Sequence, residues 1–460
     1  MSVPPAPDHS TPYRLPYQLG IFLATNAIPD AWCVIDGPDC IFRKAEWVHG
    51  RHDLRSTLLD PLGCHRVVQT LVDADKIVKD KGDRLLDRLV RVDALPHASV
   101  AFICAMPHVM IIGTQYDLII RKAQAHGTRV DFLEIPSLSL RADWYDGWIE
   151  TLCALAAQVD VSRGRPRPER VALIGHLMDR NEEDHAANVR ELRRLLEALG
   201  LEVATIWLDG SNYASLAEVR DAGTLLATPM GRRAADILAA RTGARVVPVP
   251  TPFGPSRTYR FLKAAAEATG TTARLGPLVE AELRAVVPKL EFVIPHAFTG
   301  RSVAFAGTPD LFGGMMQIAQ EFGMEVSLLA SSGRTPVGMD DLTEEEFGPL
   351  PPVLMAPRAA ALEDALAALP RPVDLVIGDS LFERFAHLDG PQVDLGFPQF
   401  FDHALFERPF LGFRGWLCLA DRMAGAIHDQ LGRVERHFPR TRRPPVGALP
   451  DLRQLVLDDE

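Results

Sequence analysis

Short apolar runs of strand length alternate with amphipathic stretches along most of the chain. The clearest unit begins at residues 170–175, an apolar run that ends in glycine. It continues into a stretch with apolar residues at helical spacing that stops at Gly200, and further strand-length runs follow at 202–207, 224–228 and 245–249. Strands that alternate with helices predict parallel β-sheets built from β-α-β units.

The same alternation starts anew twice, which predicts three blocks of one design. A stretch rich in proline and arginine at 162–168 marks the first boundary, and a second boundary follows a long helical region near 298–300. We therefore expect an α/β protein with three Rossmann-like parallel-sheet domains, at residues 1–165, 166–298 and 299–460, the last with a C-terminal tail. The acidic, proline-containing segment 334–357 is typical of a solvent-facing loop.

Composition narrows the function classes. The chain has 460 residues, of which 47% are hydrophobic and 24% charged, so it is too long for one core and typical of a globular protein. A net charge of −11 gives no electrostatic case for a nucleic-acid partner or an anionic membrane. The N-terminus has no signal pattern, and no apolar run approaches the roughly 20 residues of a membrane span. Six scattered cysteines form no secreted disulfide framework, so we expect a cytoplasmic protein.

Two cysteines lie in similar surroundings. Cys40 and Cys104 each come at the end of an apolar, strand-like run and have a proline close by. A thiol just past a strand lies at the exposed tip of an α/β sheet, where it can reach a metal, and two such thiols can share an iron–sulfur cluster. Free cysteine is also among the most buried residue types, so spacing alone leaves a packing role equally open.

The other four cysteines differ in how well they fit the role of metal ligand. Cys64 lies in a Gly-Cys-His loop and is a third candidate metal ligand because such a loop is exposed and reactive in principle. Cys33 lies inside a strand, and Cys153 and Cys418 lie on apolar helical faces. We expect these three to pack as small hydrophobic side chains.

A series of short motifs then points to a family. Gly37-Pro38-Asp39-Cys40 resembles a Gly-Pro-x-Gly-Cys ligand loop with one residue deleted, and Cys104 followed by 111–117 resembles a cysteine before an Ile-Gly-Asp-Asp turn. Segments 253–258, 396–398 and 412–415 resemble further signatures in the same order. From about residue 15 to 427 the chain is similar to the nitrogenase component 1 superfamily, which includes the dark-operative protochlorophyllide and chlorophyllide reductases.

The resemblance implies a subunit of a two-component reductase. An ATP-hydrolysing Fe protein would pass electrons through a [4Fe-4S] cluster at Cys40 and Cys104 to an unsaturated small-molecule substrate. The chain has no phosphate-binding Gly-x-x-x-x-Gly-Lys-Ser/Thr loop, so ATP hydrolysis would belong to the partner. A non-catalytic assembly scaffold, a partner subunit of the same fold and a cluster-free binding module are the alternatives.

Departures from the family pattern limit these expectations. The family's first ligand cysteine would fall near residues 13–17, where this chain has none, so one chain offers two standard ligands where a [4Fe-4S] cluster commonly needs four. A homodimer or a related second subunit would supply the rest, and Asp39 is a further candidate ligand. The family's eight-iron cluster is correspondingly not expected.

The substrate side also departs from nitrogenase. The stretch 226–231 lacks the cysteine that holds the molybdenum–iron cofactor, so no such cofactor is expected. His403 would fall near that cofactor's histidine, and we expect it to be a proton donor because imidazole supplies protons near neutral pH. Residues predicted to open on one cleft between the three blocks are His176, Asp179, Gly307 to Asp310, Asp379, Ser380 and His403. Helix capping or loop hydrogen bonding is the alternative role for each.

Overall fold

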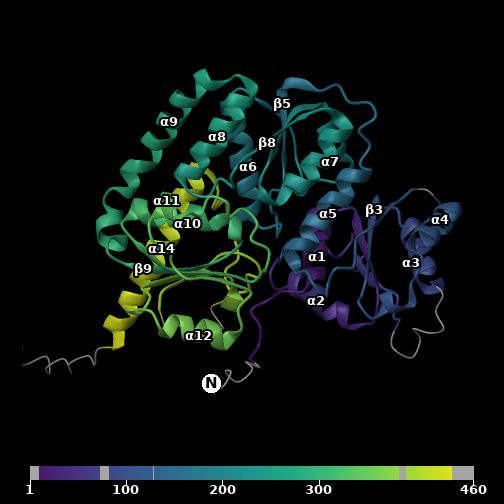
Figure 1. The fold of residues 1–460 in the computed structure, drawn as a ribbon, viewed down its shortest axis with the longest axis horizontal. Coiled ribbons are helices and arrows are strands. Elements are labelled where there is room, and N and C mark those ends of the chain that lie inside the picture. The colour runs from purple at the N-terminus through teal and green to yellow at the C-terminus, as the bar shows by residue number, and fades with distance from the viewer. Residues whose placement is uncertain (1–9, 73–81, 128, 383–389, 438–460) are drawn as a thin grey trace, which may run out of the picture.

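The computed structural model describes residues 10–72, 82–127, 129–382 and 390–437 (Figure 1). Its strands form three separate sheets, and all the strand pairings within them are parallel. Helices lie against the sheets (Figure 1), so the expected α/β class with three parallel Rossmann-like sheets is confirmed. The domain boundaries drawn from the sequence remain predictions.

The first sheet has the strand order β2-β1-β3-β4. Its strands are β1 (Ala31–Asp36), β2 (Val67–Gln69), β3 (Val100–Ala105) and β4 (Asp131–Glu134). Its helices are α1 (Tyr17–Ala27), α2 (Cys40–Val48), α3 (Asp83–Asp93), α4 (Tyr116–His126) and α5 (Trp144–Gln158). Both faces of β1 and β3 are buried, which explains why these strands are apolar without alternation.

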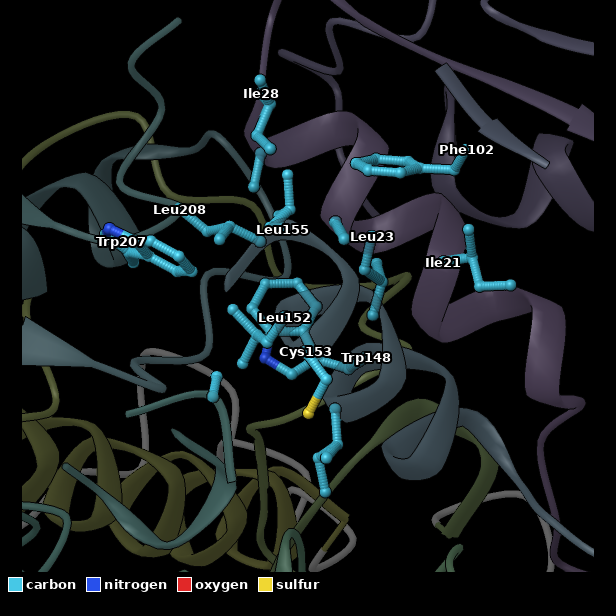
Figure 2. Packing of buried hydrophobic residues seen from close by; sticks show 14 of the residues in the cluster. Ile21, Leu23, Ile28, Phe102, Trp148, Leu152, Cys153, Leu155, Trp207 and Leu208 are labelled. Carbon is cyan, nitrogen blue, oxygen red and sulfur yellow. The ribbon is translucent and has the colours of Figure 1, made fainter. Parts of the chain in front are cut away.

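Helices α1 and α5 pack directly against each other because glycines allow their backbones to meet. A Cβ added at Gly20 would lie 1.9 Å from the carbonyl oxygen of Trp144, and one added at Gly147 would lie 2.1 Å from that of Tyr17. Figure 2 shows the core beside this crossing, where Trp148 and Leu152 of α5 lie in one hydrophobic cluster with residues of α1 and with Trp207 of the second block. One core therefore joins the first two blocks.

The second sheet has the order β6-β5-β7-β8. Its strands are β5 (Arg167–Ile174), β6 (Glu202–Ile206), β7 (Ala222–Ala227) and β8 (Arg245–Pro248). The helices of this part are α6 (Glu183–Ala198), α7 (Arg232–Thr242), α8 (Pro255–Thr269) and α9 (Thr272–Leu290), with short 3-10 turns η2 (Tyr213–Asp221) and η3 (Pro229–Gly231). Strand boundaries expected from the apolar runs agree with these to within a few residues.

The third sheet has the order β11-β10-β9-β12-β13. Its strands are β9 (Ser302–Ala306), β10 (Glu325–Ser331), β11 (Val353–Met355), β12 (Leu375–Gly378) and β13 (Gln392–Asp394), and its helices are α10 (Phe312–Phe322), α11 (Glu344–Phe347) and α12 (Ala359–Ala367). The expectation of a continuous loop at 334–357 was wrong, since α11 and β11 lie within it. Three apolar residues are too short a run to distinguish an edge strand from a loop.

The long helix α14 (Gly412–His437) follows the third sheet in the chain and packs against α6, α8 and α9 of the second block. The last part of the described chain therefore ties the second and third blocks together. None of the helices in the described ranges combines the length and apolar character needed to cross a bilayer.

Candidate functional site

Cys40 is the first residue of α2, directly after the Gly37-Pro38-Asp39 turn that follows β1. Its side chain is exposed. The turn brings the chain past the carboxyl end of β1, the edge at which α/β sheets commonly place functional groups. The thiol of Cys40 therefore lies where a second molecule can reach it.

Cys104 behaves differently, and the expectation of an exposed thiol at a strand tip was wrong for it. It lies inside β3, is 1% exposed, and shares a hydrophobic cluster with Phe102 and residues of α1. Side chains alternate along a strand, so the residue two positions after Phe102 points into the same core. Burial, and next the nearby Glu134, raise the pKa of the Cys104 thiol to about 12.

The remaining cysteines divide into exposed and packed. Cys64 is exposed in a loop before β2, where its backbone N–H donates to Asp60 Oδ1 at 2.7 Å. Cys33 and Cys153 are buried, as expected. Cys418 is partly buried, and burial raises the pKa of its thiol.

A cluster of the kind that the family pattern implies needs several thiolate or other ligands close together. In the described part of the chain, no group of three or more His, Cys, Asp or Glu side chains is placed to hold a metal. At the family's first cysteine position the chain carries two tyrosines with other partners: Tyr13 donates to Asp379, and Tyr17 donates to the carbonyl of Pro136 at 2.7 Å. The described donors of one chain alone do not fit a four-ligand cluster.

A small enclosed cavity lies where the carboxyl ends of β5, β7, β9 and β13 converge, between the second and third sheets. The space open to the centres of water molecules is about 50 Å³, enough for a few waters or one compact molecule. Gly175 (φ +93°), after β5, has to be a glycine here, because a Cβ would lie 2.2 Å from the backbone nitrogen of Gly231. Polar residues that line the cavity are His176, Asp179, His185, Thr228, Thr251, Thr308 and Asp310.

Several polar atoms of this lining have no protein partner. His176 Nε2, His185 Nδ1 and Asp310 Oδ1 are buried and make no hydrogen bond to the described chain. Burial, and next the neighbouring His185, lower the pKa of His176 to about 3, so that its imidazole is neutral. Burial raises the pKa of Asp310. Unpaired buried polar atoms are costly without a partner, so this cavity is suited to a bound ligand or ordered water.

His403 lines a different and larger space. It faces an open cleft of about 650 Å³ that it shares with Arg51 and Ser380, between the first and third blocks. Its Nδ1 lies 2.8 Å from Glu182 Oε1. The expectation of one common cleft was therefore wrong: His176, Asp179 and Gly307 to Asp310 are near the enclosed cavity, whereas Ser380 and His403 line the open cleft. Asp379 is buried beneath and lines neither.

Buried charges lie between the two spaces. Arg180 is fully buried, donates to Asp184 Oδ1 at 3.1 Å and lies 3.5 Å from Glu182. Asp179 contacts His185 and, from the first block, His52. The sequence analysis missed His185, His52 and Glu182.

For His185 a signal was present. On α6 the buried stripe that contains Leu192 and Leu195 continues towards the N-terminus through Asn188 and His185. Polar residues at core positions of a helical stripe indicate a buried polar site. His52 lies in a loop and has no comparable periodic signal.

Comparisons with known proteins agree with this architecture. Residues 18–428 match the family described as Nitrogenase component 1 type Oxidoreductase. The nitrogenase molybdenum-iron protein beta chain of Frankia alni is 27% identical over 295 residues, which are 58% of this chain and 54% of that one. The nitrogenase iron-iron protein beta chain of Rhodobacter capsulatus is 26% identical over 264 residues, 52% and 56% of the two chains. The match thus spans about half the length of these relatives.

A solved structure titled "Nitrogenase Cp1 at pH 6.5" superimposes with a TM-score of 0.79 at 16% identity, over 97% of this chain and 98% of that chain. A second, titled "Nitrogenase Cp1 at pH 5", gives a TM-score of 0.72 at 15% identity, over 95% and 92%. At such identity the likeness concerns the fold alone. The likeness in fold covers nearly the whole chain, whereas the sequence match to the beta chains covers little more than half of it.

Proposed function

Because the chain belongs to the nitrogenase component 1 type oxidoreductase family, we propose that it is a subunit of a nitrogenase-like two-component reductase. In this proposal an Fe protein that hydrolyses ATP delivers electrons, a [4Fe-4S] cluster accepts them, and an unsaturated small molecule is reduced. The iron–sulfur chemistry and the need for a partner are inferred from the family. The role of each residue is inferred from the site.

The observation that carries the proposal is the surface around Cys40. Large apolar side chains are exposed on the segments that follow the carboxyl ends of β1, β3 and β4, namely Phe42 (44%), Met110 (49%), Ile111 (85%), Leu138 (36%) and Leu140 (78%). These strands are parallel neighbours, so the segments emerge at the same edge of the sheet. Exposed apolar surface of this kind marks a protein interface, here around an accessible thiol.

The ligand count favours a cluster shared between two chains. A [4Fe-4S] cluster commonly takes four thiolates, and one chain offers Cys40 and, at the end of the neighbouring strand, Cys104. A homodimer would bring this pair twice, and a related second subunit would bring its own ligands. Cys104 has to become accessible for this to occur, and Cys64 or Asp39 would replace it if it does not. A bound cluster would supply one-electron transfer at this edge.

A second candidate function is that of a non-catalytic partner subunit, in which another chain carries the substrate. Two observations favour it. The similar curated proteins are beta chains of nitrogenases, and the enclosed cavity offers about 50 Å³ to water centres, which is too little for a tetrapyrrole or a large metal cofactor. The chain also lacks the cofactor's thiol at 226–231, so we expect no molybdenum–iron cofactor in it.

Electron transfer distinguishes these functions. The chain is purified anaerobically with whatever subunit copurifies, and mixed with the reduced Fe protein of the same organism, with and without ATP. ATP-dependent oxidation of the Fe protein is the expected result. If oxidation occurs only when a separate catalytic subunit is added, the chain is the partner subunit. Absence of oxidation in both mixtures would contradict the reductase proposal.

A further inference from the structure

The enclosed cavity contains a contact between a histidine and a carboxylate that has no role in the function proposed above. His185 Nε2, in the first turn of α6, lies 2.8 Å from Asp179 Oδ1, and both residues are buried. The other ring nitrogen, Nδ1, has no hydrogen-bond partner among the described residues, and the residue lines the cavity. One side of the imidazole is thus occupied by a carboxylate, while the other is left for a molecule in the cavity.

Asp179 is positioned from a different part of the chain. His52 is fully buried, and its Nδ1 accepts the backbone N–H of Gln399 at 2.9 Å. Since Nδ1 is the acceptor, the hydrogen of the neutral ring lies on Nε2. That Nε2 is 3.4 Å from Asp179 Oδ1 and 3.2 Å from the Asp179 carbonyl oxygen. His52 therefore holds Asp179 in place beneath His185.

The charges around His185 favour its protonated form. Burial lowers its pKa, but Asp179 and then Asp184 outweigh burial and the opposing effect of Arg180, so the pKa is raised overall. The neighbouring His176 is neutral, so it places no positive charge beside a protonated His185. The ring of Phe410 packs edge-on at 5.1 Å between centroids and adds no charge. A protonated His185 has an N–H on Nδ1 as well as on Nε2.

We propose that His185 is the proton-donating residue of the enclosed cavity, where its Nδ1–H binds the hydrogen-bond acceptor end of a compact ligand of roughly three to five non-hydrogen atoms. Asp179 and His52 are positioning residues for it. The identification of this ligand as a substrate rests on the proposed reductase function, whereas its binding does not. The donor of the cavity is thus distinct from His403, which faces the open cleft.

Formate is a suitable probe because it has three non-hydrogen atoms and an acceptor end. Its affinity is measured by isothermal titration calorimetry on the full chain, for the wild type, His185→Gln and Asp179→Asn, with the exposed His97→Gln as the matched control. We expect the first two variants to bind about tenfold or more weakly, as for loss of a hydrogen bond to a charged group. We expect His97→Gln to bind like the wild type. Equal affinity in all four proteins, or no saturable binding by the wild type, overturns the proposal.

A second measurement follows the protonation of His185 in the wild-type chain and uses a variant only to assign its signal. In the wild-type chain labelled with 13C at histidine Cε1, a pH titration by NMR follows each imidazole. His185, assigned from the spectrum of His185→Gln, should remain mostly protonated at about pH 6.5, the ordinary pKa of histidine, and formate should shift its signal. A His185 signal that is neutral at pH 6 overturns the proposal. If the wild-type chain shows these NMR signals but no turnover with the Fe protein, the reductase function is contradicted and the binding of a ligand by His185 is not.

Discussion

Tyr13 donates a hydrogen bond to the carboxyl group of Asp379, and both side chains are buried. The backbone N–H of Tyr13 also donates to the carbonyl of Pro357 at 2.7 Å. The segment before α1 is thereby attached to the third block, although α1 itself packs in the first. The contact joins parts of the chain that are 366 residues apart, so it contributes to how the blocks are held together.

The buried carboxyl of Asp379 makes stability depend on pH. Burial raises its pKa to about 7, above the ordinary value of an unfolded aspartate. The folded state therefore binds a proton more tightly than the unfolded state, and stability falls as pH rises from about 4 to about 7. The slope for one such carboxyl is at most about 1.4 kcal/mol per pH unit. Urea unfolding of Asp379→Asn between pH 5 and 8 should show a flatter dependence than the wild type.

Asp394 has to be considered in the same experiment, because burial raises its pKa to about 6. It accepts hydrogen bonds from Ser380 at 3.0 and 3.2 Å. The variant Asp394→Asn should remove only the contribution of Asp394, which ends near pH 6, and leave the contribution of Asp379, which extends to about pH 7. An unchanged profile in Asp379→Asn would mean that this carboxyl is ionised throughout.

The crossing of α1 and α5 gives a prediction about stability. Gly147→Ala places a methyl group against the backbone of Tyr17, with no flexible side chain to move away. We expect a loss of about 1–3 kcal/mol or more in the free energy of unfolding. Gly425→Ala is the matched control, because this glycine is exposed in α14 with open space around its Cα. The control should gain about 0.5–1 kcal/mol from helix propensity. Thermal and urea unfolding measure both.

Iron content tests the two proposed ligands. Cys40→Ala and Cys104→Ala should each lose at least about half of the iron and sulfide of the anaerobically purified protein, since each removes two of four thiolates from a symmetric cluster. Cys153→Ala, which removes a buried thiol of α5, should keep the wild-type content. Melting temperatures separate ligand loss from unfolding for the buried Cys104. Equal iron content in all three variants would show that Cys40 and Cys104 are not cluster ligands.

Assembly is predicted from the same ligand count. If each chain contributes two thiolates, the cluster lies between two chains and a monomer should hold none. Analytical ultracentrifugation under anaerobic conditions, with absorbance followed at 280 nm and near 400 nm, reports the mass of the species that carries the cluster. A monomer with about four irons would show instead that Cys64 or another group completes the site within one chain.

The parallel strands could be predicted from sequence because they are apolar on both faces. The run from Val171 to Ile174 is buried at all positions, and it is bounded by Gly175. Because β3 is also apolar on both faces, the sequence did not show towards which face Cys104 points. In a strand that is buried on both sides, the residue pattern does not say towards which side the last thiol points, and the core of α1 decides it.

The site was less predictable because it is assembled from single residues on different blocks. His52, Asp179 and Gln399 come together from three parts of the chain, and none of them belongs to a local pattern. The sequence likewise predicted one cleft where the structure has two spaces, because His403 lies near the predicted strand ends in chain order. In the fold, His403 contacts Glu182 and lines the open cleft.

His403 remains the proposed proton donor of that cleft, and its removal should be tolerated by the fold. Glu182 would keep the backbone N–H groups of Leu54 at 3.0 Å and Ala404 at 2.7 Å, together with Arg180. His403→Ala should therefore retain its iron, its melting temperature and its docking to the Fe protein. General acid catalysis contributes typically about 10²–10⁴-fold, so turnover should fall by a factor in that range if this imidazole delivers the proton.

The matched control for this experiment is His126→Ala, an exposed histidine at the end of α4, which should leave turnover unchanged. His403→Gln adds a second test, because glutamine can still donate a hydrogen bond to Glu182 but cannot transfer a proton. Slow turnover in both variants at His403, with ATP-dependent oxidation of the Fe protein preserved, would assign the residue to proton delivery. Wild-type turnover in His403→Ala would exclude it, and the enclosed cavity with His185 would then be the place to look for the proton source.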